Sequence, residues 1–209
     1  MSKPVTVDIF VEDRAHEAFL VPMLRRIARE EKVEVTSRVR AARGGHGRAV
    51  TELKLYQDLV QKGAAGTTSP DLLIAGIDGN CSTFAKAKKA IVAGTHAPFS
   101  ERLVVACPDP HVERWYLADP ESFKDVVGSQ PAIARKKCAR DYYKDALAKV
   151  VQKAGHPATL GGIEFAQELV ERMDLYRACK NERSLKSFVD DLRARLRAVH
   201  AGSGGGGDE

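Results

Sequence analysis

Residues 71–80 read Asp-Leu-Leu-Ile-Ala-Gly-Ile-Asp-Gly-Asn, and this stretch decides the fold. After its first Asp it is continuously apolar up to the second, which is typical of a strand buried on both faces of a parallel sheet. Further strand-like runs cover residues 5–11, 33–42 and 102–107. Helical apolar spacing separates them, as in residues 16–29. We therefore predict an α/β fold in which four parallel strands alternate with helices.

The chain changes character after residue 120, where every remaining apolar pattern has a helical period. Asp119-Pro120-Glu121 has the residue types of a helix start. We predict an α/β core over residues 1–120, a helical C-terminal part over 121–200 that packs on this core, and a disordered Gly-rich tail over 201–209. The helices of the C-terminal part are predicted over residues 135–153, 163–179 and 184–200.

Composition excludes several classes of protein. No apolar run approaches the about 20 residues that a membrane-spanning helix needs, and no apolar signal segment follows Met1, so we expect a cytoplasmic protein with no membrane partner. The four cysteines form no Cys-x-x-Cys pair, which argues against a zinc ribbon, and we expect reduced thiols. The net charge of +5 is compatible with a polyanionic partner.

Acidic residues follow three of the four predicted strands. Glu12-Asp13 ends the first, Asp78 ends the third, and the fourth runs on to Glu113. Ligands of open α/β sheets bind at the carboxyl ends of the strands, so these residues should converge. Carboxylate oxygens are preferred ligands of Mg²⁺. We interpret Glu12 and Asp78 as site residues, and Asp13 and Asp119 as helix caps.

Basic residues that could hold a polyanion occur in two groups. The first flanks a glycine loop, where the backbone can approach a phosphate closely; the second is interleaved with Tyr142 and Tyr143, whose rings could stack on bases. The two groups are Arg38, Arg40, Arg43 and Arg48, and Arg135, Lys136, Lys137, Arg140 and Lys144. A solvated helix face explains the second group equally well. Trp115, the single tryptophan, is predicted to pack in the core.

Three segments resemble the Toprim domain. Val11-Glu12 followed by residues 16–20 resembles its opening strand, glutamate and helix, and residues 78–80 occupy the place of its Asp-x-Asp pair. Residues 110–120, Pro-His-Val-Glu-Arg-Trp-Tyr-Leu-Ala-Asp-Pro, are similar to the signature of a small bacterial Toprim-like family whose members are often encoded beside ATPases. Residues 184–188 resemble that family's C-terminal ending, so the resemblance extends to about residue 200.

The resemblance implies a Toprim-like parallel sheet flanked by helices, and the chemistry of nucleases of the overcoming-lysogenization-defect type. Glu12 would then be a metal ligand or general base, Asp78 the main ligand of Mg²⁺ or Mn²⁺, and Glu113 a further carboxylate. Asn80 stands where the family has a second aspartate, and Asp13 where it has a glycine. Because Asn80 brings no charge, a second tightly held metal is less expected.

We therefore predict a metal-dependent nuclease acting on DNA or RNA, the effector of an anti-phage or toxin-like system with an ATPase partner. Glu12, Asp78 and Glu113 are its candidate catalytic residues, and Asn80 joins them as a candidate metal ligand. Two alternatives stay open. Glu12-Asp13 and Asp78 would also suit a receiver-like phosphoacceptor module, and the chain could instead be a catalytically inactive Toprim binding subunit.

Overall fold

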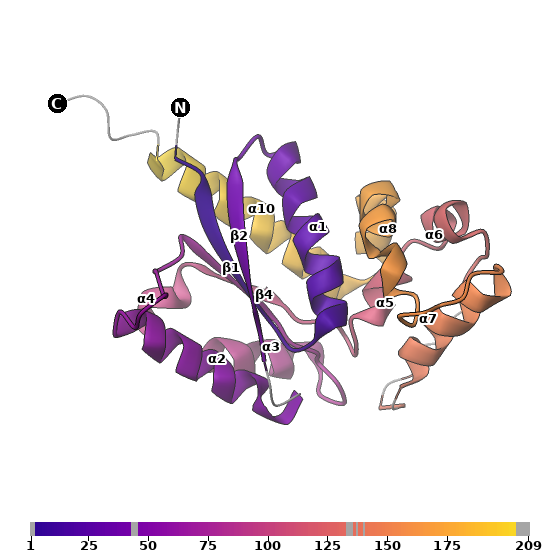
Figure 1. Ribbon diagram of the computed structural model, residues 1–209, viewed down its shortest axis with the longest axis horizontal. Helices are drawn as coiled ribbons and strands as arrows, with labels where there is room; N and C mark the ends of the chain where they lie inside the picture. Colours follow the sequence, from indigo (N-terminus) through magenta and orange to yellow (C-terminus); the bar gives the residue numbers. More distant parts are fainter. Residues whose placement is uncertain (1–2, 43–45, 133–135, 137, 140, 204–209) are drawn as a thin grey trace.

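Four parallel strands lie at the centre of the computed structural model, which describes residues 3–42, 46–132, 136, 138–139 and 141–203 (Figure 1). The strands are β1 (Val5–Val11), β2 (Val35–Ala41), β3 (Leu72–Gly76) and β4 (Leu103–Ala106). They pair in the order β2-β1-β3-β4, and every pairing is parallel. The predicted α/β fold with a four-stranded parallel sheet is confirmed.

Helices connect the strands and make up the C-terminal part of the chain. In chain order they are α1 (Arg14–Glu30), α2 (His46–Gln61), α3 (Phe84–Ala93), α4 (Ala97–Ser100), α5 (Glu113–Tyr116), α6 (Pro120–Val127), α7 (Tyr142–Lys153), the 3₁₀ helix η1 (Ile163–Phe165), α8 (Ala166–Arg172), α9 (Leu175–Asn181) and α10 (Arg183–Ser203).

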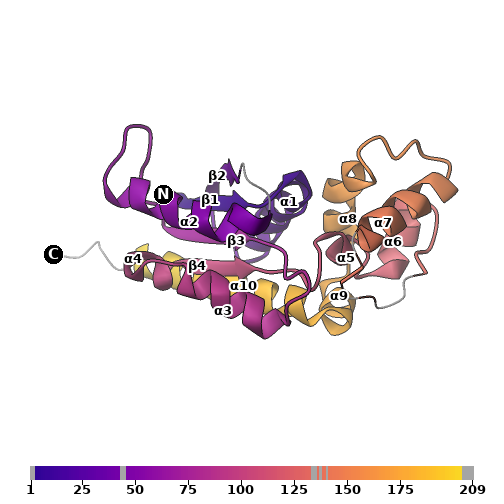
Figure 2. The same ribbon diagram turned by 90° about the horizontal axis from the view of Figure 1, so that it is seen from below.

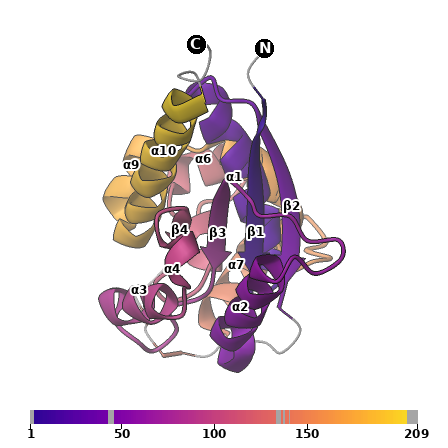
Figure 3. The same cartoon turned by 90° about the vertical axis from the view of Figure 1, so that its left-hand side faces the viewer.

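The sheet separates two apolar layers, because successive side chains of a strand point to opposite faces. In β1, Val7 and Ile9 belong to the layer that contains α1 and α10, whereas Phe10 faces the layer that contains α2 and α3. In β3, Ile74 belongs to the layer of α1 and α10, and Leu73 belongs to the layer of α2 and α3. Figure 3 shows the four strands in order, with α10 and α2 on opposite sides of the sheet. Burial on both faces explains why β3 reads as a continuous apolar run.

The C-terminal helices share the first of these layers. Trp115 of α5 is fully buried and stacks on Phe188 of α10, with 5.5 Å between the ring centroids. Its Nε1 donates a hydrogen bond to Ser184 Oγ at 2.9 Å. The predicted core role of Trp115 is confirmed. Helices α6, α7 and α8 lie together at one end of the molecule, away from both termini (Figures 1 and 2).

Several predicted helix limits were wrong, and local capping explains most of the differences. Helix α1 begins at Arg14, because Asp13 caps its first turn. The helix also continues through Pro22. The helix predicted over residues 163–179 is instead η1, α8 and α9, because Asp174 accepts a hydrogen bond from Arg177 N and starts a new helix. Helix α7 begins only at Tyr142, although a helix was predicted from residue 135.

The prediction of a disordered tail over residues 201–209 was wrong for its first three residues, since α10 continues through Ala201 and Gly202 to Ser203. Residues 204–209 lie outside the described part of the chain. Cys81 and Cys138 form a disulfide, whereas Cys107 and Cys179 are free thiols; the expectation of four reduced thiols was therefore wrong for one pair. A spacing of 57 residues gives no sign of this pairing in the sequence. Among the described residues, no helix is long and apolar enough to cross a membrane.

Candidate active site at the carboxyl edge of the sheet

An acidic cavity of about 230 Å³ lies at the carboxyl ends of the strands. The strands run from the end with the chain termini toward the end where α5, α7 and α8 lie, so this edge faces those helices (Figure 1). The cavity brings together all four predicted ligands and four further side chains. Its lining residues are Glu12, Asp13, Asp78, Asn80, His111, Glu113, Asp141 and Lys144.

Glu12 and Asp78 are neighbours because β1 and β3 are paired. Glu12 N donates to Gly76 O at 2.9 Å, which extends the pairing by one residue beyond β1. The Oε2 atom of Glu12 then accepts a hydrogen bond from Asp78 N at 3.1 Å. Parallel pairing therefore places side chains that are 66 residues apart in one cavity.

The loop after β3 is held against the segment after β4. Gly79 N donates to Pro108 O at 2.8 Å, and Asn80 N donates to Pro110 O at 2.9 Å. The Asp109–Pro110 peptide bond is cis. A Cβ atom on Gly79 would lie 2.8 Å from Pro108 O, so this close approach of two backbones requires glycine. The loop thereby carries Asn80 to the rim of the cavity.

Asp78 is held by two histidines that the sequence reasoning did not select. His111 Nδ1 lies 2.9 Å from Asp78 Oδ2, and Val112 N donates to Asp78 Oδ1 at 3.0 Å. His16 Nε2 lies 3.1 Å from Asp78 Oδ1, an ion-pair distance at an angle outside hydrogen-bonding geometry. Burial opposes ionisation of Asp78, but the charge of His16 and the hydrogen bond from His111 outweigh it and lower the pKa of Asp78.

His16 is fully buried below the cavity, between Asp78 and Asp13. Its burial would lower its pKa, yet the two carboxylates outweigh this effect and raise the pKa of His16 to about 10. Asp13 caps α1 as predicted, since its Oδ1 accepts from His16 N at 3.0 Å. Burial opposes ionisation of Asp13 too, but the contacts with His16 lower its pKa to about 2. A charged imidazolium therefore joins two carboxylates.

Glu113 shows the opposite shift. It begins α5, and its pKa is raised by burial first and then by the negative charges of Asp78 and Asp13. Like charges that share a site disfavour each other's ionised form. Burial and the nearby negative charges of Asp78 and Asp13 therefore both favour the neutral form of Glu113. A cation in the cavity would relieve this repulsion.

The predicted capping role of Asp119 was wrong in its detail. Asp119 precedes α6, but its side chain makes no capping hydrogen bond to that helix. It is buried, and its Oδ2 accepts from Ser122 Oγ at 2.5 Å and from Asp174 N at 2.8 Å. Arg177 Nε also donates to its Oδ1 at 3.1 Å. Asp119 therefore joins the hydroxyl of Ser122, in the first turn of α6, to the start of α9, and its carboxylate binds these groups instead of a backbone N–H of its own helix.

The C-terminal part contributes Asp141 and Lys144 to the cavity. The disulfide joins Cys81, next to Asn80, to Cys138, three residues before Asp141. Lys144 is exposed and forms no ion pair or hydrogen bond among the described residues. The sequence reasoning placed Lys144 among the basic residues that could bind a polyanion, but it missed Asp141. It connected neither residue with the acidic edge, because no strand or motif places α7 there. The proximity of His16 and His111 to the acidic residues in the chain was a usable signal.

The predicted basic residues lie in different surroundings. Arg38 Nε donates to the buried Asp8 at 2.5 Å and Arg38 Nη2 to Thr68 O at 2.9 Å, so Arg38 has structural partners. Arg40 is half-buried, whereas Arg48 and Lys136 are exposed. Arg43, Arg135, Lys137 and Arg140 lie outside the described residues. Nucleic-acid binding by all of these side chains stays a prediction.

The two tyrosines of α7 divide between surface and core. Tyr143 is fully buried, and its hydroxyl accepts a hydrogen bond from Lys136 N at 3.0 Å. A ring buried in this way offers no face to a base. Tyr142 is half-buried, with Lys136 Nζ 4.9 Å from its ring centroid. Only Tyr142 of this pair keeps a surface position.

The cavity has the oxygen donors of a hard-cation site, in Glu12, Asp78, Asn80 and Glu113. Within the described ranges, no group of three or more His, Cys, Asp or Glu side chains is arranged to hold a metal ion. No curated protein and no solved structure matches the chain. Residues 11–193 match the family model described as "Domain of unknown function (DUF4276)", so the chain belongs to that family.

Proposed function

We propose that this protein is a Mg²⁺- or Mn²⁺-dependent nuclease that hydrolyses phosphodiester bonds at the acidic cavity. The observation that carries the proposal is the convergence of Glu12, Asp78, Asn80 and Glu113 on one cavity at the carboxyl edge of a parallel sheet. The resemblance of residues 110–120 to Toprim-like proteins supports the same chemistry. A cytoplasmic location, an ATPase partner and a role in antiviral defence belong to this proposal.

The donor set fits a divalent cation of the Mg²⁺ class. Glu12, Asp78 and Glu113 offer carboxylate oxygens and Asn80 an amide oxygen, and a positive charge would offset the negative charges that, after burial, raise the pKa of Glu113. When bound, such a metal would activate a water molecule and stabilise the leaving oxygen. With Asn80 in place of a carboxylate, one tightly held ion is the expected stoichiometry.

The protein's own side chains would orient the metal ligands and bind the phosphate. The His16 imidazolium, anchored by Asp13, fixes the orientation of Asp78 and keeps it ionised. His111 holds the other oxygen of Asp78. Lys144 is the cation of the cavity without an ion-pair partner among the described residues, so its ammonium group is available to a phosphate. Attack of water on the phosphorus then breaks one P–O ester bond. The phosphate product keeps the oxygen of the water, and the leaving oxygen takes up a proton and becomes a hydroxyl group.

The receiver-like alternative has less support. A phosphoacceptor oxygen must be free to form a covalent bond to phosphorus, whereas both oxygens of Asp78 are held by His16, His111 and Val112. A metal ion needs only one of the lone pairs that these contacts leave on the carboxylate. Incubation with a small phosphodonor, followed by intact-mass measurement, would detect phosphorylation of Asp78. An adduct there would favour signalling over hydrolysis.

The test of the nuclease proposal is a cleavage panel with purified full-length protein. Single-stranded and duplex DNA and RNA are incubated with Mg²⁺ or Mn²⁺, and with EDTA as the metal-free control. Cleavage is expected with metal only, and Glu12→Gln and Asp78→Asn are expected to abolish it. Asp125→Asn removes an exposed carboxylate that does not line the cavity and should leave cleavage unchanged. Equal rates for wild type and Asp78→Asn would refute the site.

A further inference from the structure

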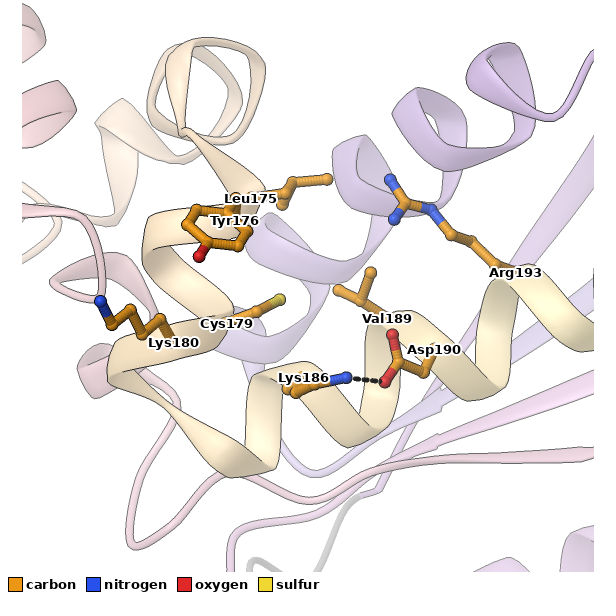
Figure 4. Close-up of a pocket in the computed structure, with 8 residues that line it drawn as sticks. All are labelled: Leu175, Tyr176, Cys179, Lys180, Lys186, Val189, Asp190 and Arg193. Carbon is orange, nitrogen blue, oxygen red and sulfur yellow. Dashed lines mark hydrogen bonds and ion pairs between the residues drawn. The ribbon is translucent and has the colours of Figure 1, made fainter.

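Two further pockets lie side by side where α9 meets α10. The first, of about 680 Å³, is lined by the start of α3, by Arg114 and by residues 180–184. The second, of about 590 Å³, is lined by Tyr176 and Lys180 of α9 and by Lys186 and Val189 of α10, among others (Figure 4). Lys180 lines both pockets, so they form one continuous surface. We call this surface the α9–α10 track.

The track begins beside the acidic cavity. Its first pocket is lined by Thr83 and Asp109, and the acidic cavity is lined by Asn80 and His111. These residues belong to the same two segments, the loop after β3 and the segment after β4, which are hydrogen-bonded to each other. A polymer with one unit in the acidic cavity could therefore extend along the track.

Two cations of the track are available to a ligand. Arg114 is paired with Glu182 at 2.6 Å, Lys186 is paired with Asp190, and Arg193 is paired with Glu30 at 2.6 Å. In contrast, Lys180 and Arg183 are exposed, and neither forms an ion pair or a hydrogen bond among the described residues. Their uncompensated charges favour an anionic ligand.

An exposed aromatic ring lies next to these cations. Tyr176 is 78% exposed, the largest exposed fraction among the large apolar and aromatic side chains of the described chain. It precedes Lys180 by four residues on α9, so both side chains project from one face of the helix (Figure 4). Leu175 and Val189 form the apolar floor of the same pocket. A tyrosine ring in such a place can stack on a planar, unpaired base, and an adjacent lysine can bind the flanking phosphate.

We propose that the α9–α10 track binds a single-stranded segment of the nucleic acid whose phosphodiester lies in the acidic cavity. Lys180 and Arg183 bind the backbone phosphates, and Tyr176 stacks on a base. This inference rests on the proposed nuclease function and adds to it that the substrate is single-stranded on this side of the cleavage site. An exposed ring selects unpaired bases, because the bases of a duplex already stack on each other.

The test measures binding separately from cleavage. Fluorescence anisotropy is followed with a labelled single-stranded oligonucleotide and full-length protein in EDTA. Tyr176→Ala is expected to weaken binding by roughly 5- to 100-fold, the range of one base-stacking interaction, whereas Tyr176→Phe keeps the ring and should bind like wild type. Lys180→Ala and Arg183→Ala should each lower the salt dependence of the affinity by about one unit of slope. Lys62→Ala, an exposed lysine outside the track, should change nothing beyond a small nonspecific effect.

A second probe separates stacking from a general loss of structure. With an oligonucleotide of abasic residues, wild type and Tyr176→Ala are expected to bind equally, because no base is left to stack. Equal binding of the ordinary oligonucleotide by wild type, Tyr176→Ala and Lys180→Ala would overturn the inference. An intact duplex that competes as well as the single strand would do so too.

The cleavage panel distinguishes failure of this inference from failure of the proposed function. Metal-dependent cleavage, together with binding that is unchanged by substitution of Tyr176, Lys180 or Arg183, would support the nuclease proposal and refute the role of the α9–α10 track. Binding that depends on Tyr176, without cleavage in any metal, would refute the nuclease proposal. The α9–α10 track would then be the binding surface of an inactive subunit.

Discussion

His16 Nε2 lies 3.1 Å from Asp78 Oδ1, below the floor of the acidic cavity. The other ring nitrogen, Nδ1, lies 2.9 Å from Asp13 Oδ1. One buried imidazolium therefore connects the cap of α1 to the aspartate that ends β3, and it holds two carboxylates in the ionised form before any cation binds. This contact adds to those of His111 and Val112 N, which also hold the carboxylate of Asp78.

Replacement of this histidine should destabilise the protein in a pH-dependent way. We expect His16→Gln to lower the free energy of unfolding by about 3 kcal/mol at pH 6, because it removes the buried cation between Asp78 and Asp13 and leaves Asp78 with only His111 and Val112 N as partners. The pKa of His16 is about 10 in the folded protein, against 6.5 as its ordinary value. Its stabilising contribution is thus fully present below pH 6.5 and is lost as the pH rises toward 10.

The measurement is urea unfolding of wild type and His16→Gln between pH 5 and pH 10. The difference between the two proteins should shrink steadily above pH 6.5. His200→Gln is the matched control, since His200 is exposed near the end of α10, and its curve should follow that of wild type. A difference that stays constant up to pH 10 would show that His16 is not charged in the folded state.

Gly79 should tolerate no side chain. In Gly79→Ala the new Cβ would lie 2.8 Å from Pro108 O, and two hydrogen-bonded backbone segments would have to separate. We expect a loss of about 1–3 kcal/mol in the free energy of unfolding, the usual cost of overpacking, together with loss of cleavage activity because Asn80 is displaced.

Gly202→Ala provides the comparison, because a Cβ at that position meets nothing within 4 Å in α10. This variant should be as stable as wild type or slightly more stable, since Ala favours a helix over Gly. Both are measured by urea unfolding. If Gly79→Ala unfolds at the same urea concentration as Gly202→Ala, the backbone of Gly79 does not approach Pro108 as closely as described.

Much of the fold could be predicted from local patterns, and the acidic edge followed from topology. The apolar run of β3 is set by its burial on the sheet, and Val35 and Val39 of β2 are partly buried against the core on one side of it. The four strands were therefore found within one or two residues. Parallel strands then bring Glu12 and Asp78 to one edge, and the segment after β4 carries Glu113 to the same edge at the start of α5. The strands and the edge at which they end can be predicted from the sequence because apolar periodicity is a local property of the chain.

The remainder of the site depends on long-range packing. His16 enters the site because the first turn of α1 faces β3, and Lys144 because α7 folds back over the carboxyl edge. The partners of Asp119 come from α6 and α9, so its capping role could not be judged from the Asp-Pro-Glu pattern. Tyr143 is likewise buried by tertiary contacts. The basic residues beside it in the sequence suggested a surface position instead.

Divalent metal should stabilise the folded protein if the acidic cavity binds it. A ligand at 100 times its Kd adds about 2.7 kcal/mol to the free energy of unfolding. For a chain of this size that corresponds to a rise in Tm of roughly 5–10 °C. Thermal unfolding with increasing Mg²⁺ or Mn²⁺ measures the effect.

The rise should disappear in Asp78→Asn, and it should persist in Asp125→Asn, whose side chain lies outside the cavity. A Tm that responds to metal equally in both variants would place the binding elsewhere in the chain. Such a result would leave the acidic cavity without its proposed metal.

Lys144 should matter for cleavage and little for stability. Its ammonium group lines the acidic cavity without an ion-pair partner among the described residues, so its removal breaks no internal contact. If the group stabilises charge that develops on the phosphate, Lys144→Ala should lower kcat by roughly 100-fold, the usual cost of losing one donor aimed at a transition state.

Lys149→Ala supplies the control, because Lys149 is exposed on the same helix and does not line the cavity. Rates are measured with saturating substrate, so that kcat and KM are separated. A rise in KM alone would assign Lys144 to ground-state binding of the nucleic acid. Equal kcat and KM for the two lysine variants would mean that α7 only covers the cavity, and the cation that offsets the phosphate charge would then have to be the metal itself.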